Sequence, residues 1–220
     1  MHWEDEGYLL SKSNFDENSI IIETFTLKHG KCAGIIYGGS SKKNKKIFQL
    51  GNKILLNYNS KNENRMGYFS SELIEAVSPM FFDSKMKSIC MLSAVSILKI
   101  LLPERQINKV IYNSFEELLN KLNLENLIKF YIFWELSLIK ELGFDVDLPN
   151  LNGNLTNSVK INDKTFLIPK VILNQSKKFV SKEDVKKALM FNKNILIENF
   201  FFPNKLRMPL SRNILEKYFS

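Results

Sequence analysis

The change of hydrophobic pattern near Ser78-Pro79 is the feature that most constrains the fold of this chain. Before this point, short apolar runs partly alternate with polar residues and are separated by glycine and asparagine, which is typical of β-strands joined by turns. After it, apolar residues recur with a period near 3.6, which is typical of amphipathic helices. We therefore expect a strand domain over residues 1–78 and a helical domain over residues 79–220.

Five strands are predicted in the first domain, and turn-forming residues separate them. The predicted strands are 7–13, 19–27, 31–39, 53–59 and 66–75. The turns between them are predicted at Asp16-Glu17-Asn18, His29-Gly30, Gly38-Gly39 and Asn62-Glu63-Asn64. Five short strands in this length fit a five-stranded OB-fold barrel, although an SH3-like barrel leaves a similar pattern. The predicted fold class is α+β.

The second domain is predicted to be an α-helical bundle with an irregular insertion around residues 144–180. The predicted helices are one that ends before Pro103, 108–122, 123–142 with Asn123 as its cap and Gly143 after its end, one that starts at Ser181, 191–202 and 211–219. Proline and glycine interrupt the insertion, where residues 159–161 and 165–168 are expected to pair as a small hairpin across Asn162-Asp163.

The net charge of +8 favours an anionic partner, although the many lysines and asparagines are also what an AT-rich genome encodes. Residues 28–65 carry nine basic side chains against one acidic, and residues 151–220 carry 13 against five. The first block overlaps the predicted barrel. The second is either another nucleic-acid surface or a lysine-rich exterior, and the sequence leaves both readings open.

Side chains suited to catalysis are scarce. The chain has two histidines, His2 at the terminus and His29 in a Lys-His-Gly turn, where a surface or phosphate-contacting role is favoured over a general base. Neither a Walker A sequence nor Gly-x-Gly-x-x-Gly is found, and Cys32 and Cys90 do not form a Cys-x-x-Cys pair. We expect a protein that is not an enzyme and that has no cofactor, metal or disulfide.

The cellular setting is predicted from the same sequence. The first residues are acidic where a signal peptide is basic, and no apolar run approaches the ~20 residues of a membrane span. We expect a cytoplasmic protein without a membrane partner.

Nucleic-acid binding is predicted for the lysine run after Gly38-Gly39 and for basic residues in neighbouring strands and turns. By composition alone the run is equally well explained as a solvated loop. Together the residues are expected to line one positive groove that binds phosphates without sequence preference. They are Lys28, His29, Lys31, Lys42, Lys43, Lys45, Lys46, Lys53 and Arg65. Of the aromatics between them, Tyr37 and Tyr58 are predicted to be exposed for base stacking and the others to be core.

Several segments together resemble the RecO family, in the form found among alphaproteobacteria. They are Trp3-Glu4-Asp5-Glu6-Gly7-Tyr8-Leu9-Leu10, Glu23-Thr24-Phe25-Thr26-Leu27-Lys28-His29-Gly30-Lys31, Gly34-Ile35-Ile36-Tyr37-Gly38-Gly39, Gln49-Leu50-Gly51-Asn52, Leu101-Leu102-Pro103-Glu104-Arg105 and Trp134-Glu135-Leu136-Ser137-Leu138-Ile139-Lys140-Glu141-Leu142-Gly143-Phe144. The resemblance covers residues 1–148 well and the rest weakly. Its specificity lies in the order and spacing of these segments, because no single one is diagnostic.

The resemblance implies a non-enzymatic DNA repair protein of the RecF recombination pathway, with an N-terminal OB fold and a C-terminal helical domain. It implies binding of single- and double-stranded DNA, annealing of complementary strands, and work with RecR and SSB that helps RecA to load on SSB-coated single strands. It places the protein in the bacterial cytoplasm with the nucleoid. Its DNA face would include Lys28, His29, Lys31 and the lysines of the 42–46 loop.

Two departures from the family change what the resemblance implies. Many members carry a four-cysteine zinc element, whereas residues 144–180 contain no cysteine, so zinc is not expected. Members also often place a basic residue before the aromatic-Glu-Leu triplet, in a region implicated in docking the acidic C-terminal tail of SSB, and here that residue is Phe133. Arg105, Lys129 and Lys140 are the candidates to replace it.

Glu135 lies in an otherwise apolar stretch between Trp134 and Leu136, so we expect a structural role, with Arg105 as its counter-charge if it is buried.

Two other functional classes stay open. A general OB-fold RNA or single-stranded DNA binder shares the basic groove but need not anneal strands. An adaptor that recruits partners through its helical domain binds DNA weakly, with little dependence on salt.

Overall fold

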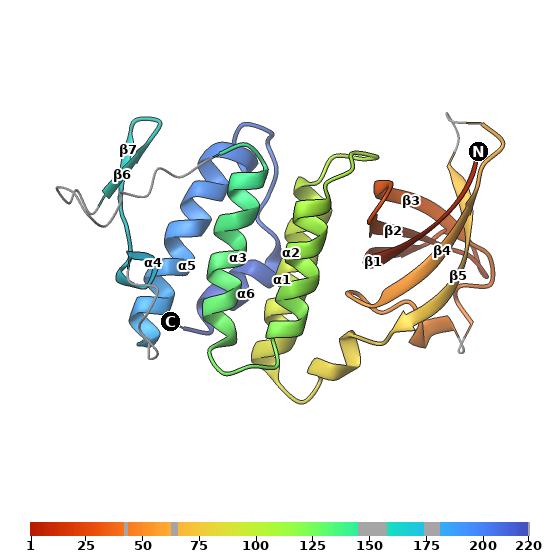
Figure 1. Cartoon of the computed structure of the whole chain (residues 1–220), viewed down its shortest axis with the longest axis horizontal. Helices are drawn as coiled ribbons and strands as arrows, with labels where there is room; N and C mark the ends of the chain where they lie inside the picture. The colour runs from red at the N-terminus through yellow and green to blue at the C-terminus, as the bar shows by residue number, and fades with distance from the viewer. Residues whose placement is uncertain (42–43, 63–65, 145–157, 174–180, 220) are drawn as a thin grey trace. The chain divides into compact units, whose positions relative to one another are not determined.

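The computed structural model describes residues 1–41, 44–62, 66–144, 158–173 and 181–219. Its internal contacts divide the chain into two compact units, Met1–Asn113 and Ser114–Ser220. Strands give way to helices near residue 78, as Figure 1 shows, and the division between the units falls within helix α2 (Lys109–Lys121). The predicted domain boundary at residue 78 lies inside the first unit and stays a prediction.

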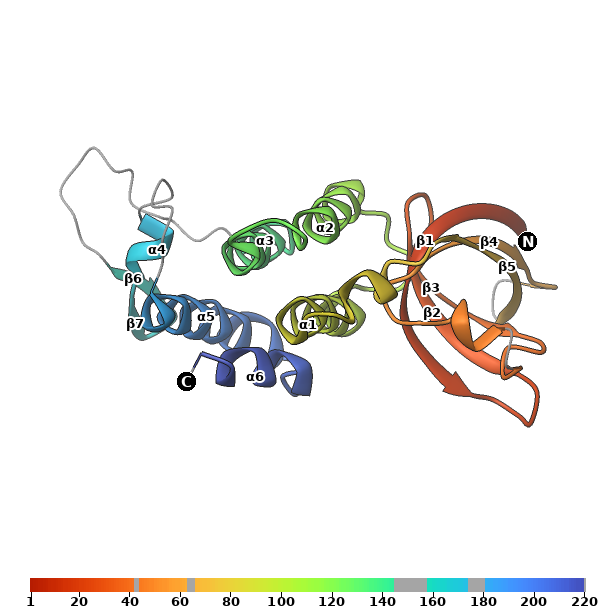
Figure 2. The same cartoon turned by 90° about the horizontal axis from the view of Figure 1, so that it is seen from below.

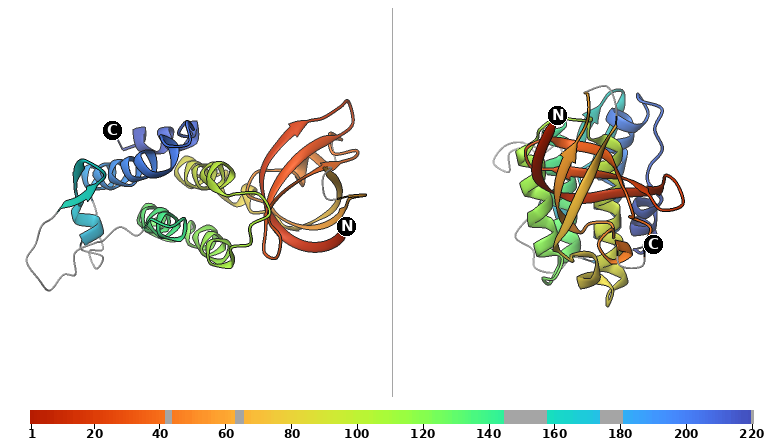
Figure 3. Two further views of the ribbon diagram at one scale, coloured as in Figure 1. Left: turned by 90° about the horizontal axis from the view of Figure 1, so that it is seen from above. Right: turned by 90° about the vertical axis from the view of Figure 1, so that its right-hand side faces the viewer.

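The first unit contains a closed barrel of five strands, which curve around one another in Figures 2 and 3. The strands are β1 (His2–Asn14), β2 (Ile20–Thr26), β3 (Gly30–Ile36), β4 (Lys53–Asn59) and β5 (Gly67–Glu75). Their order is β1-β2-β3-β5-β4, β4 pairs back to β1, and β3 runs parallel to β5. This is a Greek-key barrel of the OB type, so the predicted fold class is confirmed.

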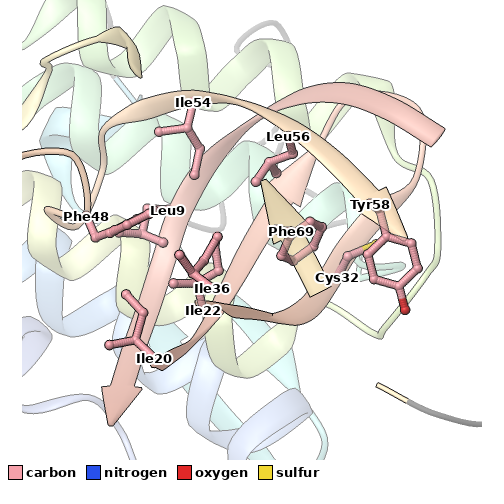
Figure 4. Close-up of a cluster of buried hydrophobic side chains, with 10 residues drawn as sticks. All are labelled: Leu9, Ile20, Ile22, Cys32, Ile36, Phe48, Ile54, Leu56, Tyr58 and Phe69. Atoms are coloured by element: carbon pink, nitrogen blue, oxygen red, sulfur yellow. The ribbon is translucent and has the colours of Figure 1, made fainter. Parts of the chain in front are cut away.

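Alternating side chains fill the barrel. Along β4 every second residue is buried, which puts Ile54, Leu56 and Tyr58 on the inner face. The barrel core, drawn in Figure 4, consists of Leu9, Ile20, Ile22, Cys32, Ile36, Phe48, Ile54, Leu56, Tyr58 and Phe69. Tyr58 is only 4% exposed, so the prediction that it is exposed was wrong.

The helices of the first unit follow the barrel. Two short 3-10 helices, η1 (Asn44–Lys46) and η2 (Ser78–Phe81), precede α1 (Lys85–Leu101). The Ser84 hydroxyl accepts a hydrogen bond from Lys87 N and caps α1, which packs against β1. The Asn108 side chain caps α2 in the same way, because its oxygen accepts a hydrogen bond from Ile111 N. This agrees with the predicted start of that helix.

The second unit continues α2 and adds α3 (Leu127–Glu141), α4 (Lys170–Leu173), α5 (Lys182–Leu196), a π-helical turn η3 (Ile197–Phe201) and α6 (Leu210–Lys217). Helix α5 packs against α3 and α6 (Figure 2). The predicted hairpin is confirmed as β6 (Ser158–Ile161) and β7 (Lys164–Leu167). Gly143 has a φ of 98° after α3, which confirms its predicted position.

Two predicted helix boundaries were wrong. Helix α3 starts at Leu127 and not after Asn123, because Asn126 adopts the left-handed conformation with a φ of 63°. Residues 191–202 do not form a separate helix, since α5 continues to Leu196 and passes directly into η3.

Glu135 is fully buried, and its counter-charge is Arg212. The Arg212 guanidinium donates to both carboxylate oxygens, while Tyr131 and Asn192 donate to one oxygen each. The predicted structural role with a charged partner is therefore confirmed, but Arg105 as that partner was wrong, because the carboxylate pairs with Arg212 instead. Sequence alone could not pair residues 77 positions apart.

Within the described ranges, no helix has both the length and the apolar character needed to span a bilayer. The same residues contain no group of three or more His, Cys, Asp or Glu side chains arranged to hold a metal ion.

Candidate nucleic-acid interface

The turn between β2 and β3 brings Lys28, His29 and Lys31 to one open end of the barrel. A pocket of about 350 Å³ lies there, and we call it the mouth pocket. It is lined by Met1, Trp3, Lys28, His29, Lys31, Cys32, Ala33, Tyr58, Met66, Glu104, Arg105 and Ile107. Three of the predicted DNA-binding residues thus share one site with aromatic and apolar side chains.

Asp5, which is buried beneath the turn, holds His29 in place. Its carboxylate accepts hydrogen bonds from Lys28 N at 2.7 Å and from the His29 ring, whose Nδ1 lies 3.0 Å from Asp5 Oδ2. Because a carboxylate only accepts, the proton of this bond belongs to Nδ1, and Nε2 is the second polar atom of the ring. The orientation of the imidazole is therefore fixed.

Trp3 completes an aromatic cluster in the mouth pocket. Its ring stacks with His29 at a centroid distance of 4.1 Å and with Tyr58 at 4.9 Å. Sequence analysis did not single out Trp3 as a site residue, because three acidic residues follow it and the start of β1 was therefore not predicted as a strand. The pairing of Trp3 with Tyr58 across β1 and β4 is the signal that only the fold supplies.

Arg105 also lines the mouth pocket, although we predicted it as a candidate for the SSB tail. Its backbone N–H donates to Lys31 O at 2.8 Å, which ties the segment after α1 to the start of β3. Arg105 has a φ of 58°, a conformation that costs a non-glycine residue about 1–3 kcal/mol. The Lys31 ammonium is itself anchored on Lys99 O at 2.8 Å.

Cys32 closes the floor of this pocket as a neutral thiol. Burial raises the pKa of the Cys32 thiol to about 11, and the nearby Arg105 opposes that effect only in part. At neutral pH the thiol is therefore neither a nucleophile nor a strong metal ligand.

The lysines of the β3–β4 connection lie at the other end of β3. Lys45 and Lys46 are exposed in η1, whereas Lys42 and Lys43 lie outside the described residues. The connection is held by the Asn44 amide, which donates to Gly38 O. Since β3 spans seven residues, roughly 20 Å separates its two ends. The described basic residues thus form two groups, one at each end of β3, and the single groove that the sequence predicts stays a prediction.

Lys53 adds little to either group. The Lys53 ammonium lies 3.1 Å from Glu6 Oε1, and its side chain is only 13% exposed. A phosphate would have to compete with this ion pair. Arg65 lies outside the described residues.

Tyr37 and Tyr68 form an exposed pair beside this connection, which we call the tyrosine pair. Tyr37 follows β3 and Tyr68 lies on β5, and the two strands run parallel as neighbours. The two residues are 65% and 46% exposed, and their ring centroids lie 6.0 Å apart. Tyr37 is exposed as predicted. Tyr68 was expected in the core, but its neighbours Gly67 and Phe69 occupy the inner face instead.

Comparison with known proteins links these elements to one family. The model described as Recombination protein O N terminal matches residues 1–77, and Recombination protein O C terminal matches residues 86–150. The chain is 32% identical to DNA repair protein RecO of Ehrlichia chaffeensis over 173 residues, 77% of this chain and 68% of that protein. The chain belongs to the RecO family.

Other RecO relatives show a similar extent of agreement. DNA repair protein RecO of Cereibacter sphaeroides is 34% identical, and that of a Wolbachia strain from Drosophila simulans is 33% identical. Each match covers 67% of this chain and 62% of the relative, so the aligned part spans about two thirds of the RecO proteins it matches. The mouth pocket and the tyrosine pair lie within the residues that the RecO models match.

The remaining candidates for the SSB tail lie in the second unit of the chain. Lys129, Phe133 and Lys140 share one face of α3, since 4 and 11 residues are about one and three helical turns. Phe133 lines a pocket of about 200 Å³ with Ser114, Glu117, Leu118, Lys121, Phe130, Trp134 and Ser137. Phe133 therefore widens an apolar surface at the position where a basic residue is often found.

Proposed function

We propose that this chain acts in DNA repair and homologous recombination as a mediator of the RecF pathway. It binds single- and double-stranded DNA, anneals complementary strands, and assists the loading of RecA on SSB-coated single-stranded DNA. It does this by binding and without catalysing a chemical reaction. The tyrosine pair is the observation that carries this proposal.

Two large rings exposed side by side on an OB barrel are costly unless they meet a partner, because exposed apolar surface is unfavourable in water. Unpaired bases provide that partner, and each stacked base contributes about 1–3 kcal/mol on such a ring. Lys45 and Lys46 lie in the connection that follows Tyr37, where they are placed to contact the phosphates of the same strand. Lysines bind phosphates as point charges, so the binding has no sequence preference.

Protein partners complete the proposed function. The acidic tail of SSB fits the face of α3 that carries Lys129, Phe133 and Lys140, because two cations flank an apolar pocket there. RecR is the second proposed partner, and RecA is the recombinase whose loading is assisted.

The test is annealing of complementary oligonucleotides coated with cognate SSB. Wild type is expected to anneal them. The Tyr37→Ala/Tyr68→Ala variant and the Lys42/Lys43/Lys45/Lys46→Ala variant are expected to lose most of this activity. Lys85→Ala removes one exposed charge at the start of α1 and is the control, with annealing like that of wild type.

The outcomes separate the proposed function from its alternatives. DNA binding without annealing would replace it with a general OB-fold RNA or single-stranded DNA binder. Neither binding nor annealing would leave an adaptor that recruits partners through its helices. Loss of annealing in the lysine variant but not in the tyrosine variant would remove the tyrosine pair from the DNA path.

A further inference from the structure

We propose that the mouth pocket binds one unpaired nucleotide of a DNA strand, with the base against Trp3 and His29 and the phosphate against Lys28, Lys31 and Arg105. The inference rests on the proposed function, since it assumes that the barrel binds DNA. It adds a second, distinct contact, because β3 separates this pocket from the lysines that follow Tyr37.

The aromatic side of the pocket is rigid before any ligand arrives. His29 is held by Asp5 and stacked on Trp3 at an interplanar angle of 9°, yet its side chain is still 33% exposed. A ring that is already fixed loses little conformational freedom when a base stacks on it. Trp3 is partly exposed as well, whereas Tyr58 beneath it is buried and supports it.

The rim of the pocket is apolar and open. Met1, Met66 and Ile107 are each more than half exposed around the aromatic cluster. Flat rings bordered by flexible methionines suit the face of a nucleobase, which is apolar and planar.

The cationic side of the pocket matches a phosphate. Lys28, Lys31 and Arg105 supply three positive charges against two acids, Glu104 on the lining and Asp5 beneath His29. Arg105 brings a planar fork of N–H donors that fits phosphate oxygens in pairs. The left-handed backbone conformation of Arg105 is maintained by the hydrogen bond from its N–H to Lys31 O. Strained conformations of this kind are retained where the side chain must point in one functional direction.

The size of the pocket selects the kind of DNA. At about 350 Å³ it is at the lower end of pockets for small ligands, so it accepts one nucleotide but not a base pair. A base within a duplex would have to leave its stack at a cost of a few kcal/mol, so the pocket favours unpaired nucleotides at strand ends or in single strands.

The experiment uses the full chain and oligonucleotides that carry one 2-aminopurine, whose fluorescence is quenched by stacking. The probes are a single strand with the label at its end, a single strand with an internal label, the matching duplex, and free 2-aminopurine nucleoside triphosphate. We expect quenching with the single strands at saturating wild-type protein, and much less with the duplex.

The variants separate the ring from the charges. His29→Gln keeps a hydrogen-bond donor near Asp5 but removes the ring, so we expect the quenching to be lost. Lys28→Gln and Arg105→Gln keep the ring and are expected to weaken binding about fivefold or more at low salt. Lys85→Gln makes the same charge change outside the pocket and is expected to match wild type. Because the Lys28 side chain is exposed, its variant tests the pocket even if His29→Gln fails to fold.

Each outcome decides the inference separately from the proposed function. If wild type binds the strands but His29→Gln quenches them equally, the mouth pocket holds no base, while DNA binding by the barrel stands. If wild type binds no DNA at all, the inference and the proposed function are both overturned. Quenching of the free nucleotide but not of the strands would also overturn the inference, because the ligand would then be a mononucleotide.

Discussion

Two buried groups of opposite character show how single residues stabilise this protein. Glu135 is ionic and fully enclosed, and it has Arg212, Tyr131 and Asn192 as donors. Cys32 is enclosed among apolar residues of the barrel and stays neutral. The contribution of Glu135 to stability depends on its hydrogen-bond donors, and that of Cys32 depends on its thiol staying protonated.

Removing one member of the Glu135–Arg212 pair should destabilise the protein strongly. Glu135→Gln removes the carboxylate closest to the buried Arg212 guanidinium and leaves it only Glu216, 3.9 Å away, at a cost of about 3–5 kcal/mol. Urea unfolding monitored by circular dichroism measures the change. Arg105→Gln is the control, with a change below about 1 kcal/mol because Arg105 is exposed. If Glu135→Gln unfolded like wild type, the pair would contribute nothing to stability.

The Cys32 thiol should make stability fall at high pH. Its pKa is raised to about 11, so between about pH 9 and 11 the folded protein holds a proton that the unfolded chain releases. Stability that is fully present below pH 9 is lost as pH rises through this window, by up to about 3 kcal/mol. Denaturant unfolding of wild type and Cys32→Ala at pH 8.5 and 10.5 measures the difference, and a difference that does not change with pH would contradict the prediction.

The turn between β2 and β3 shows how one element joins the barrel to the segment after α1. Gly30 has a φ of 70°, and a Cβ at this position would lie 2.2 Å from Gln106 O. The Thr26 hydroxyl donates to Gly30 O and accepts from His29 N, which closes the turn. The turn therefore needs glycine both for its backbone conformation and for the close approach of residues 105–106.

Gly30→Ala and Gly38→Ala form a matched pair that separates these two requirements. Both glycines have a positive φ, but nothing lies within 4 Å of a Cβ at Gly38. We expect a loss of about 1 kcal/mol for Gly38→Ala and of about 3 kcal/mol or more for Gly30→Ala. Thermal unfolding checks this, and equal losses would show that residues 105–106 move aside at no cost.

The elements were predictable to the extent that local chemistry defines them. Alternation and turn residues located all five strands, and Asn108 and Gly143 mark helix ends as capping rules require. The start of β1 was missed because its first residues are acidic and do not read as a strand. Tyr58 was placed on the wrong face although Ile54 and Leu56 share its period of two.

The candidate site was less predictable, because it joins segments that are distant in sequence. Lys28, His29 and Lys31 follow from one turn, but Trp3 and Arg105 reach the same pocket from the start of β1 and from beyond α1. The separation of these residues from Lys45 and Lys46 also depends on the direction of β3, which charge counts along the chain do not contain.

At the scale of the whole molecule, we expect the basic residues to make the proposed DNA binding depend on salt. The net charge is +8, and each phosphate neutralised on a single strand contributes a slope of about −0.7 to log K against log salt. Lys45→Ala/Lys46→Ala should therefore make the slope shallower by about 1.4, or about 0.7 per lost contact. Fluorescence anisotropy with a labelled single strand between 50 and about 300 mM salt measures the slope, and an unchanged slope would show that these lysines do not touch phosphate.

The closed strand order of the barrel also determines how copies of this protein tolerate crowding. A sheet with an open edge presents unpaired amides and carbonyls that recruit strands from neighbouring molecules. In this barrel β4 returns to β1, so every strand has a neighbour on both sides. The barrel therefore offers neighbouring copies no free strand edge on which to aggregate at high local concentration.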